Sequence, residues 1–324
     1  MSEHPFKVHF RGVRGSIPTP ASAGDIEAKL RYALSEASAE DLESSETVDR
    51  FIAGLPLHVR GCIGGNSACV EMTVGGHRIM FDGGSGCFNV GRDWMKEEFG
   101  RGKGQAHIFM THTHLDHIMG LPMFGPLYVP GNQLTFYSPH TDLKQRLSGQ
   151  HLPEYFPVSF DSLGSTMEFV SLSDTQTVEI DDIKISWLEN DHPGRSFSYR
   201  VEYQGHVAVL STDAEYKTLD PAILDPVLEF FRDADVLIFD AQYGFTESVQ
   251  LKRDWGHSSS FVGVDLALDA GVKRLALFHH EPTSDDFHLV EVLKKAQTYL
   301  QNVEPGSELE VLLAYEGLVL DFSS

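Results

Sequence analysis

Short apolar runs that end in histidine or aspartate recur along this sequence. The run from Ala106 to Met110 has the composition of a buried strand, and it leads into Thr111-His112-Thr113-His114-Leu115-Asp116-His117, with helical spacing from Ile118 onward. The same succession of an apolar strand and a polar residue at its end occurs at Asp82, His192, Asp213 and His279. These strand ends are therefore expected to meet at one rim of a pair of sheets.

The histidine-rich segment predicts a metal site. One ion needs three or four ligands, and alternate residues leaving a strand point to opposite sides, so the pair His112 and His114 and the pair Asp116 and His117 suit two adjacent ions. The alternative is a surface turn that is rich in histidine by chance. Four potential ligands within six positions favour the metal.

The charge balance limits the partners of this chain. Lysine and arginine number 25 against 47 aspartates and glutamates, which gives a formal net charge of −22. Such a chain repels polyanions, so a long nucleic acid is not expected as its partner. Hydrophobic residues make up 41% of the sequence, enough for a sizeable core in a single domain over residues 1–324.

Cysteine usage and hydropathy indicate the compartment. Cys62, Cys69 and Cys87 are odd in number and lack Cys-x-x-Cys spacing, which argues against both a disulfide framework and a thiolate metal site. No apolar run approaches the about 20 residues that a bilayer crossing needs, and the segment from Met1 to Phe10 has no apolar signal core. We therefore expect a cytoplasmic protein that has no membrane segment.

The motif His-x-His-x-Asp-His after an apolar strand resembles the signature of the metallo-β-lactamase fold hydrolases. The resemblance extends from about Lys7 to the C-terminus and implies an α/β fold, the four-layer αββα sandwich of that family. It also implies a dinuclear centre in which one ion is held by His112, His114 and His192, the other by Asp116, His117 and His279, and both by a bridging Asp213. Asp82 would orient the metal-binding loop without binding the ions.

Ligation by nitrogen and oxygen suits two divalent metal ions, zinc in the first place. Manganese or iron are the alternatives, because imidazole and carboxylate do not select sharply among these metals. Family members with oxygen-reducing di-iron chemistry would have glutamate in place of His114, and lactamases with a thiolate ligand would have cysteine in place of Asp213. Neither departure occurs here.

Two further motifs resemble the ribonuclease Z-like branch of the family. They are the turn Gly256-His257-Ser258 and the position of His279 three residues before Pro282. This resemblance implies a phosphoric diester hydrolase that works through a metal-bridging hydroxide. The acidic charge balance and the lack of a basic arm favour a small or cyclic phosphodiester over tRNA as its substrate.

Three residues are candidates for the catalytic steps. Asp116 would orient the hydroxide in addition to binding metal, and His257 would protonate the leaving alkoxide. His280 is a second candidate for the latter role. The alternatives are that the serines after His257 only cap a helix beside a solvated imidazole, and that His280 is a packing residue.

Other functions remain open from the sequence. Ribonuclease Z enzymes, which process the 3′ end of tRNA, carry a basic arm, whereas residues 141–190 here contain three basic and nine acidic side chains. A lactonase or thioesterase is an alternative, since the same ions can polarise a carbonyl group. A metal-binding sensor without turnover is a further alternative, although a complete ligand set argues against it.

Residues 21–63 form an insertion relative to the family pattern, because they delay the turn Gly64-Gly65-Asn66. Within the insertion, Ile26, Leu30 and Leu34 recur at helical spacing, as do Val48, Phe51 and Ile52, which predicts two short amphipathic helices. These helices would cover the mouth of the active site, form the contact of a homodimer, or stand as a surface arm.

Overall fold

Two seven-stranded sheets form the centre of the protein in the computed structural model, which describes residues 5–172, 177–218, 220–243 and 254–323. The strand order of the first sheet is β14 (Val319–Asp321), β1 (Phe6–Gly12), β2 (Cys69–Val74), β3 (His77–Phe81), β4 (Gln105–Phe109), β5 (Gln133–Ser138) and β6 (Thr166–Ser171). The order of the second is β13 (Glu310–Leu313), β12 (Arg274–Phe278), β11 (Val236–Asp240), β10 (His206–Ser211), β9 (Ser196–Tyr203), β8 (Ile183–Asn190) and β7 (Thr177–Ile180).

The strands β4 and β12, which lead into the motifs at His112 and His279, run parallel to their neighbours and are largely buried on both faces. β3 to β6 run parallel to one another, and so do β10 to β13. In β4 the side chain of Phe109 packs between the sheets against Tyr199, at a ring distance of 5.4 Å, while Ile108 points to the opposite face and is also buried. Burial on both faces explains the continuous apolar runs in the sequence.

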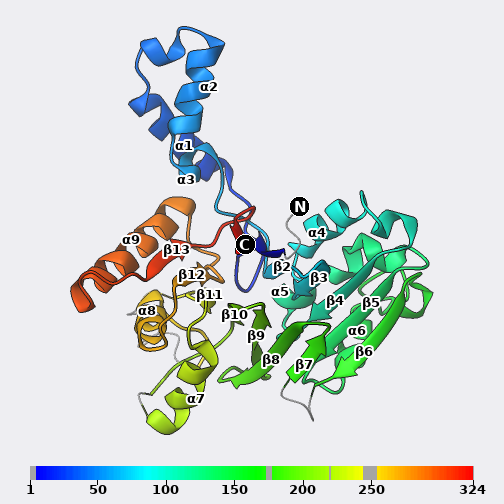
Figure 1. Cartoon of the computed structure of the whole chain (residues 1–324). Coiled ribbons are helices and arrows are strands. Elements are labelled where there is room, and N and C mark those ends of the chain that lie inside the picture. Colours follow the sequence, from blue (N-terminus) through cyan, green and yellow to red (C-terminus); the bar gives the residue numbers. More distant parts are fainter. Residues whose placement is uncertain (1–4, 173–176, 219, 244–253, 324) are drawn as a thin grey trace.

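Helices cover the outer faces of both sheets. The helices are α4 (Cys87–Trp94), α6 (Leu143–Gly149), α7 (Pro221–Phe231), α8 (Ser260–Asp269) and α9 (Asp286–Val303), and the 3₁₀ turns are η2 (Phe99–Arg101), η3 (Leu121–Met123), η4 (Gly125–Tyr128) and η5 (Phe160–Ser162). α8 packs on β11 and β12, and α9 packs on β13, whereas α4 and α6 join the core on the outer face of the first sheet. Figure 1 shows α7, α8 and α9 on one side of the molecule and α4 and α6 on the other. The predicted four-layer αββα sandwich is confirmed.

The helix expected from Ile118 onward is wrong. The structure has a single turn, α5 (Leu115–Ile118), that begins inside the histidine-rich motif and gives way to η3. Gly120 explains the break, because its N–H donates to the carbonyl of Gly83 at 2.9 Å and a Cβ at this position would lie 2.2 Å from the carbonyl oxygen of Gly84. The chain therefore leaves the helix to pack closely against the loop after β3.

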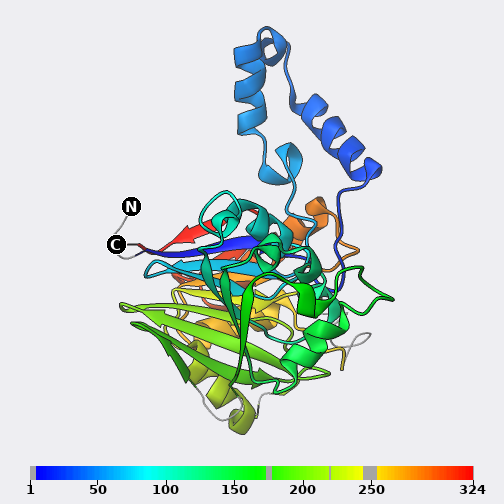
Figure 2. The same cartoon turned by 90° about the vertical axis from the view of Figure 1, so that its right-hand side faces the viewer.

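The predicted insertion forms a helical arm, which comprises α1 (Ala23–Glu36), η1 (Glu40–Leu42), α2 (Ser45–Gly54) and α3 (Leu57–Arg60). Ser22 and Ser44 each cap a helix by accepting a hydrogen bond from the backbone three residues on. Figures 1 and 2 both show the arm standing away from the two sheets. Within one chain it therefore does not fold back over the body.

Among the described residues, no helix combines the length and the apolar character that a membrane crossing requires.

Candidate metal centre

The structure brings all seven predicted metal ligands together at one rim of the sandwich. His112, His114, Asp116 and His117 follow β4, His192 follows β8, Asp213 follows β10 and His279 follows β12. Six of these side chains are buried, and His114 is exposed. The rim is formed by the C-terminal ends of strands from both sheets, as expected from the repeated pattern of strand and terminal residue.

Two groups of three ligand atoms lie on either side of Asp213. Within each group the ligand atoms lie within 4.8 Å of one another, and the groups are His112, His114 and His192 on one side and Asp116, His117 and His279 on the other. Oδ1 of Asp213 lies 3.7 Å from Nε2 of His112 and 3.8 Å from Nε2 of His192. Oδ2 lies 3.1 Å from Nε2 of His117 and 3.4 Å from Nε2 of His279. Each carboxylate oxygen therefore faces one group, the geometry that a bridging ligand needs.

The donor set fits divalent cations. Nε2 of His112 is buried and has no hydrogen-bond partner among the described residues. Two pairs of imidazole nitrogens face each other, with 3.1 Å between His192 Nε2 and His114 Nδ1 and 3.2 Å between His117 Nε2 and His279 Nε2. Burial lowers the pKa of His112 well below its ordinary value, so its nitrogen is available as a lone-pair donor.

Buried hydrogen bonds orient the ligands. Asp82 accepts a hydrogen bond of 2.8 Å from Nδ1 of His117 and two more from the backbone and hydroxyl of Thr111. Nδ1 of His192 similarly donates to the carbonyl of Gly256 at 2.9 Å. In both histidines Nε2 is thereby left facing the cluster, which is how outer residues select the tautomer of a metal ligand.

The backbone is strained at three residues of the cluster. Asp82, Asp213 and His279 have φ angles of 58°, 55° and 60°, in the left-handed region that side chains with a Cβ rarely adopt. Each of them directly follows the end of its strand or stands one residue beyond it. Such strain concentrates at functional sites, where the surrounding structure holds it in place.

His257 lies beside the cluster and is paired with Asp240 at the end of β11. Nδ1 of His257 donates to Asp240 at 2.8 Å and lies 3.9 Å from Oδ1 of Asp213, and its ring stacks on that of His279 at 5.1 Å. Burial opposes the charged imidazole, but the carboxylates of Asp240, Asp213 and Asp116 outweigh it and raise the pKa of His257 to about 9. His257 is therefore a buried member of the site and not a solvated neighbour of the helix cap.

Asp116 is held by a backbone contact that the sequence pattern does not predict. Its Oδ2 accepts a hydrogen bond of 2.7 Å from the backbone N–H of Ser16 and lies 3.2 Å from Nε2 of His279. Ser16 adopts a φ of 60°, and its hydroxyl accepts from Gln242. Two features of the sequence point to polar groups near this site. One is the turn Gly15-Ser16 after the first strand, and the other is the run of polar residues that follows the strand ending at Asp240.

His280 is not brought into the cluster. Its Nε2 lies 2.8 Å from the carbonyl oxygen of Ala314, to which it donates, and the side chain is buried. Burial lowers the pKa of His280 to about 3. The neighbouring backbone of His280 also pairs with Arg14, so the residue joins the loop after β12 to the first strand.

Sequence comparison identifies curated relatives of this chain. It is 26% identical to a ribonuclease Z of Thermoplasma acidophilum over 248 residues, which cover 63% of this chain and 77% of the relative. It is 25% identical to a ribonuclease Z of Archaeoglobus fulgidus over 300 residues, which cover 76% of this chain and 92% of the relative.

Solved structures share the fold. The metallo-β-lactamase fold protein YhfI of Bacillus subtilis superposes with a TM-score of 0.64 at 17% identity and covers 98% of this chain and 99% of its own. The short form of human tRNase Z superposes with a TM-score of 0.56 at 18% identity, covering 97% of this chain and 98% of its own. The family model of the β-lactamase superfamily domain matches residues 77–280. Because that match spans more than half of the chain and includes all seven candidate ligands, this protein belongs to the β-lactamase superfamily and is a ribonuclease Z-like hydrolase of the metallo-β-lactamase fold.

Proposed function

We propose that this protein is a dinuclear, zinc-dependent phosphodiesterase that hydrolyses a small or cyclic phosphodiester. The observation that carries the proposal is the hydrogen-bonded pair His257–Asp240 beside Asp213, which puts a proton carrier next to a donor set for two ions. When bound, the ions would lower the pKa of water and neutralise negative charge that develops on the phosphoryl group.

The protein's own residues would orient the reaction. Nδ1 of His117 donates to Asp82, and Nδ1 of His192 donates to the carbonyl of Gly256. These hydrogen bonds hold each imidazole with Nε2 toward the cluster. Ser16 fixes the carboxylate of Asp116, which orients the attacking water in addition to serving as a ligand. Asp240 accepts the Nδ1 proton of His257 and stabilises its charged imidazolium form, in which Nε2 carries a second proton, the one that the leaving alkoxide would take up.

A small substrate is supported by the charge of the chain and by a cavity beside the metal-binding loop. The cavity has a volume of about 430 Å³ and is lined by Pro139, His140, Thr141, Asp142, Arg146, Trp187 and Arg195. Arg146 reaches the loop itself through a hydrogen bond of 3.1 Å to the hydroxyl of Thr113, between two ligands. A substituent of the diester would find cationic and aromatic side chains there, whereas the net charge of −22 disfavours a long polyanion.

Cleavage of a tRNA precursor is the second candidate, because the curated relatives are named ribonuclease Z. A location in the cytoplasm belongs to the same proposal, and the free thiols of Cys62, Cys69 and Cys87 support it. Manganese and iron are the alternatives to zinc, since the ligands are imidazoles and carboxylates.

The test is hydrolysis of bis-(p-nitrophenyl) phosphate by protein loaded with zinc, manganese or iron. We expect release of nitrophenol that is lost in Asp213→Ala and strongly reduced in His257→Ala. Absence of release with all three metals would contradict the proposal. Turnover of a lactone or thioester would then assign the site to carboxyl-ester chemistry. Cleavage of a tRNA precursor would assign it to RNA processing. Stoichiometric metal without turnover of any of these substrates would indicate a sensor.

A further inference from the structure

The helical arm carries an apolar stripe that the rest of the chain leaves uncovered. Ile26, Leu30 and Leu34 of α1 are 52%, 58% and 69% exposed. Their spacing of four residues places them on one face of the helix. The opposite face is anchored, because Lys29 is buried and the ring of Tyr32 packs at 6.0 Å from that of Phe287 in α9.

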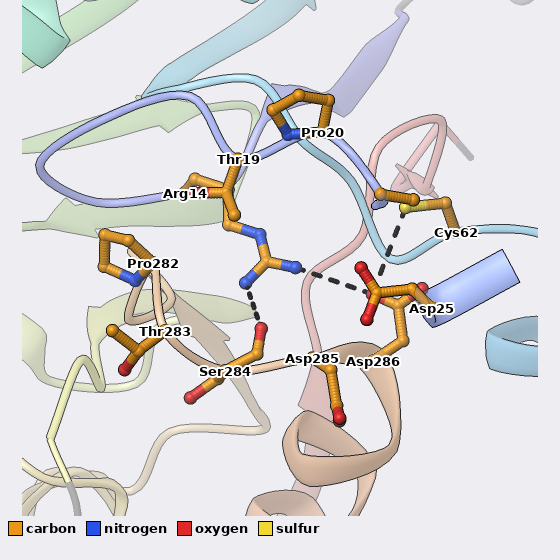
Figure 3. Close-up of a pocket in the computed structure, with 11 residues that line it drawn as sticks. Arg14, Thr19, Pro20, Asp25, Cys62, Pro282, Thr283, Ser284, Asp285 and Asp286 are labelled. Atoms are coloured by element: carbon orange, nitrogen blue, oxygen red, sulfur yellow. Dashed lines mark hydrogen bonds and ion pairs between the residues drawn. The ribbon is translucent and has the colours of Figure 1, made fainter. Parts of the chain in front are cut away.

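The root of the arm is rigid, so the stripe has a fixed position. Asp286 at the start of α9 binds Lys29 of α1 at 2.5 Å and the backbone N–H of Ile63 at 3.2 Å. Arg14 donates to the carbonyls of Gly64 and Ser284, both at 2.7 Å, and lies 3.5 Å from Asp286. Figure 3 shows the guanidinium of Arg14 reaching Ser284 and Asp286 where the arm leaves the body. Buried ion pairs of this kind hold one geometry because breaking them leaves an unpaired charge.

The outer part of the arm has little core of its own. α2 packs mainly on η1, and within the described chain it has no buried residue. Ile52 of α2 and Leu42 of η1 are 47% and 57% exposed. Helices of about ten residues are marginal in water without a packing partner, so the arm would gain stability from a surface that covers its apolar side chains.

The charges of the arm indicate which kind of partner it can bind. Residues 21–61 contain eight carboxylate side chains and four cationic ones, which disfavours nucleic acid and anionic lipid. Glu27 and Arg31 lie beside the stripe, four residues apart, and carry opposite charges. Their carboxylate and guanidinium groups are 2.6 Å apart. If two copies of α1 pack antiparallel about a two-fold axis at Leu30, Ile26 meets Leu34 of the other copy, and the Glu27 side chains reach toward the Arg31 side chains across the axis.

We propose that the stripe Ile26, Leu30 and Leu34 is the contact through which two copies of this chain form a homodimer. In this arrangement the apolar side chains pair with each other and the charges meet opposite charges across the axis, as a two-fold interface requires. Two helices of this length bury an area at the lower end of the range for protein interfaces, so the dimer should dissociate on dilution. The contact lies outside the metal centre and does not depend on the reaction that the centre performs.

The test is sedimentation velocity of the full chain over a series of concentrations. We expect a dimer for the wild type and a rise of about tenfold or more in its dissociation constant for Leu30→Asp, because the axis brings two carboxylates together. Ile223→Asp is the matched control, since Ile223 is a comparably exposed aliphatic residue of α7, at 56%, and this variant should dimerise like the wild type.

Reversing the charges of Glu27 and Arg31 distinguishes a weakened interface from a misfolded variant. Glu27→Arg and Arg31→Glu should each weaken self-association, because like charges then meet across the axis. An equimolar mixture of the two variants should recover the dimer, since opposite charges are restored. A wild type that stays monomeric at every concentration would overturn the proposal and leave the stripe to a different protein. A Leu30→Asp dimer as strong as the wild type would overturn it as well.

Discussion

The carboxylate of Asp240 accepts a hydrogen bond of 2.8 Å from Nδ1 of His257. Asp240 ends a strand in the middle of the second sheet, and the backbone N–H groups of Gln242 and Ala214 bind the same carboxylate at 3.1 and 3.4 Å. The carboxylate is therefore fixed by its own sheet and cannot turn away from the imidazole. Through this contact the core of the sandwich stabilises the protonated imidazole of the residue that we propose as the proton donor.

Asp240→Asn should lower kcat by about 10- to 100-fold while KM and the metal content stay near those of the wild type. A neutral amide no longer stabilises the charged imidazolium of His257, so less of the residue carries the proton that it would donate from Nε2. Steady-state hydrolysis of bis-(p-nitrophenyl) phosphate together with elemental analysis measures both quantities. Asp235→Asn, at the other end of the same strand, is the control and should keep kcat, because Asp235 binds Lys273 and not the site. An unchanged kcat in Asp240→Asn would remove the positioning role.

Asp213→Ala should reduce the bound metal of both groups, since each carboxylate oxygen faces one of them. Metal that binds only the folded state stabilises it by about 2.7 kcal/mol at a concentration 100 times the Kd, so a chelator should lower Tm of the wild type by several degrees. Tm of Asp213→Ala should not respond to the chelator. Asp321→Ala, which loses an exposed ion pair with Lys7, should respond like the wild type. Two ions retained per chain in Asp213→Ala would contradict the bridging geometry.

Gly256→Ala should displace His192. Gly256 has a φ of 85°, and a Cβ there would lie 2.2 Å from Nδ1 of His192. Gly205→Ala is the control that has the unfavourable backbone conformation without a steric clash. Its φ is 83°, and an added Cβ meets no described atom within 4 Å. Both variants should lose about 1–3 kcal/mol of unfolding free energy. Metal content should fall in Gly256→Ala alone, and equal metal content in the two variants would show that the close contact is unimportant.

The buried strands and the positions of the candidate ligands could be predicted because both depend on local sequence, whereas the layers of the fold came from the family resemblance. Parallel strands buried on both faces give continuous apolar runs, and the ligands follow these runs within a few positions, as His112 follows β4 and His279 follows β12. The resemblance to a known signature then supplied the order in which the strand ends meet.

The contacts that complete the site were not predicted, because they join residues far apart in the chain. Asp240 looked like an ordinary aspartate at a strand end, and only the fold places it against His257. Ser16 reaches Asp116 over 100 positions, from a backbone conformation that its residue type does not favour. The direction of the arm is likewise set by Asp286, which lies 257 residues beyond Lys29.

Acidification should destabilise the protein partly through His107, a residue away from the metal centre. Burial, together with the neighbouring His77, lowers the pKa of His107 to about 4. Because the unfolded chain takes up this proton near pH 6.5 and the folded protein only near pH 4, the stability present above pH 6.5 is lost as the pH falls between these values. His107→Gln should therefore show a smaller loss of urea midpoint between pH 7 and pH 5 than the wild type. Equal losses would mean that His107 is protonated alike in both states.

Asp286→Ala should cost about 3–5 kcal/mol of unfolding free energy, because it leaves the buried cations of Lys29 and Arg14 without their carboxylate. Glu291→Ala in the same helix breaks an exposed pair with Lys294 at 2.7 Å and should cost at most about 1 kcal/mol. Urea unfolding of both variants measures the difference. Since Asp286 also holds the backbone of Ile63, limited proteolysis of Asp286→Ala should cut first within residues 21–63, whereas Glu291→Ala should be cut like the wild type. Equal costs in the two variants would mean that the arm is not anchored through Asp286, and a fixed direction of the stripe on α1 could then no longer be derived from its root.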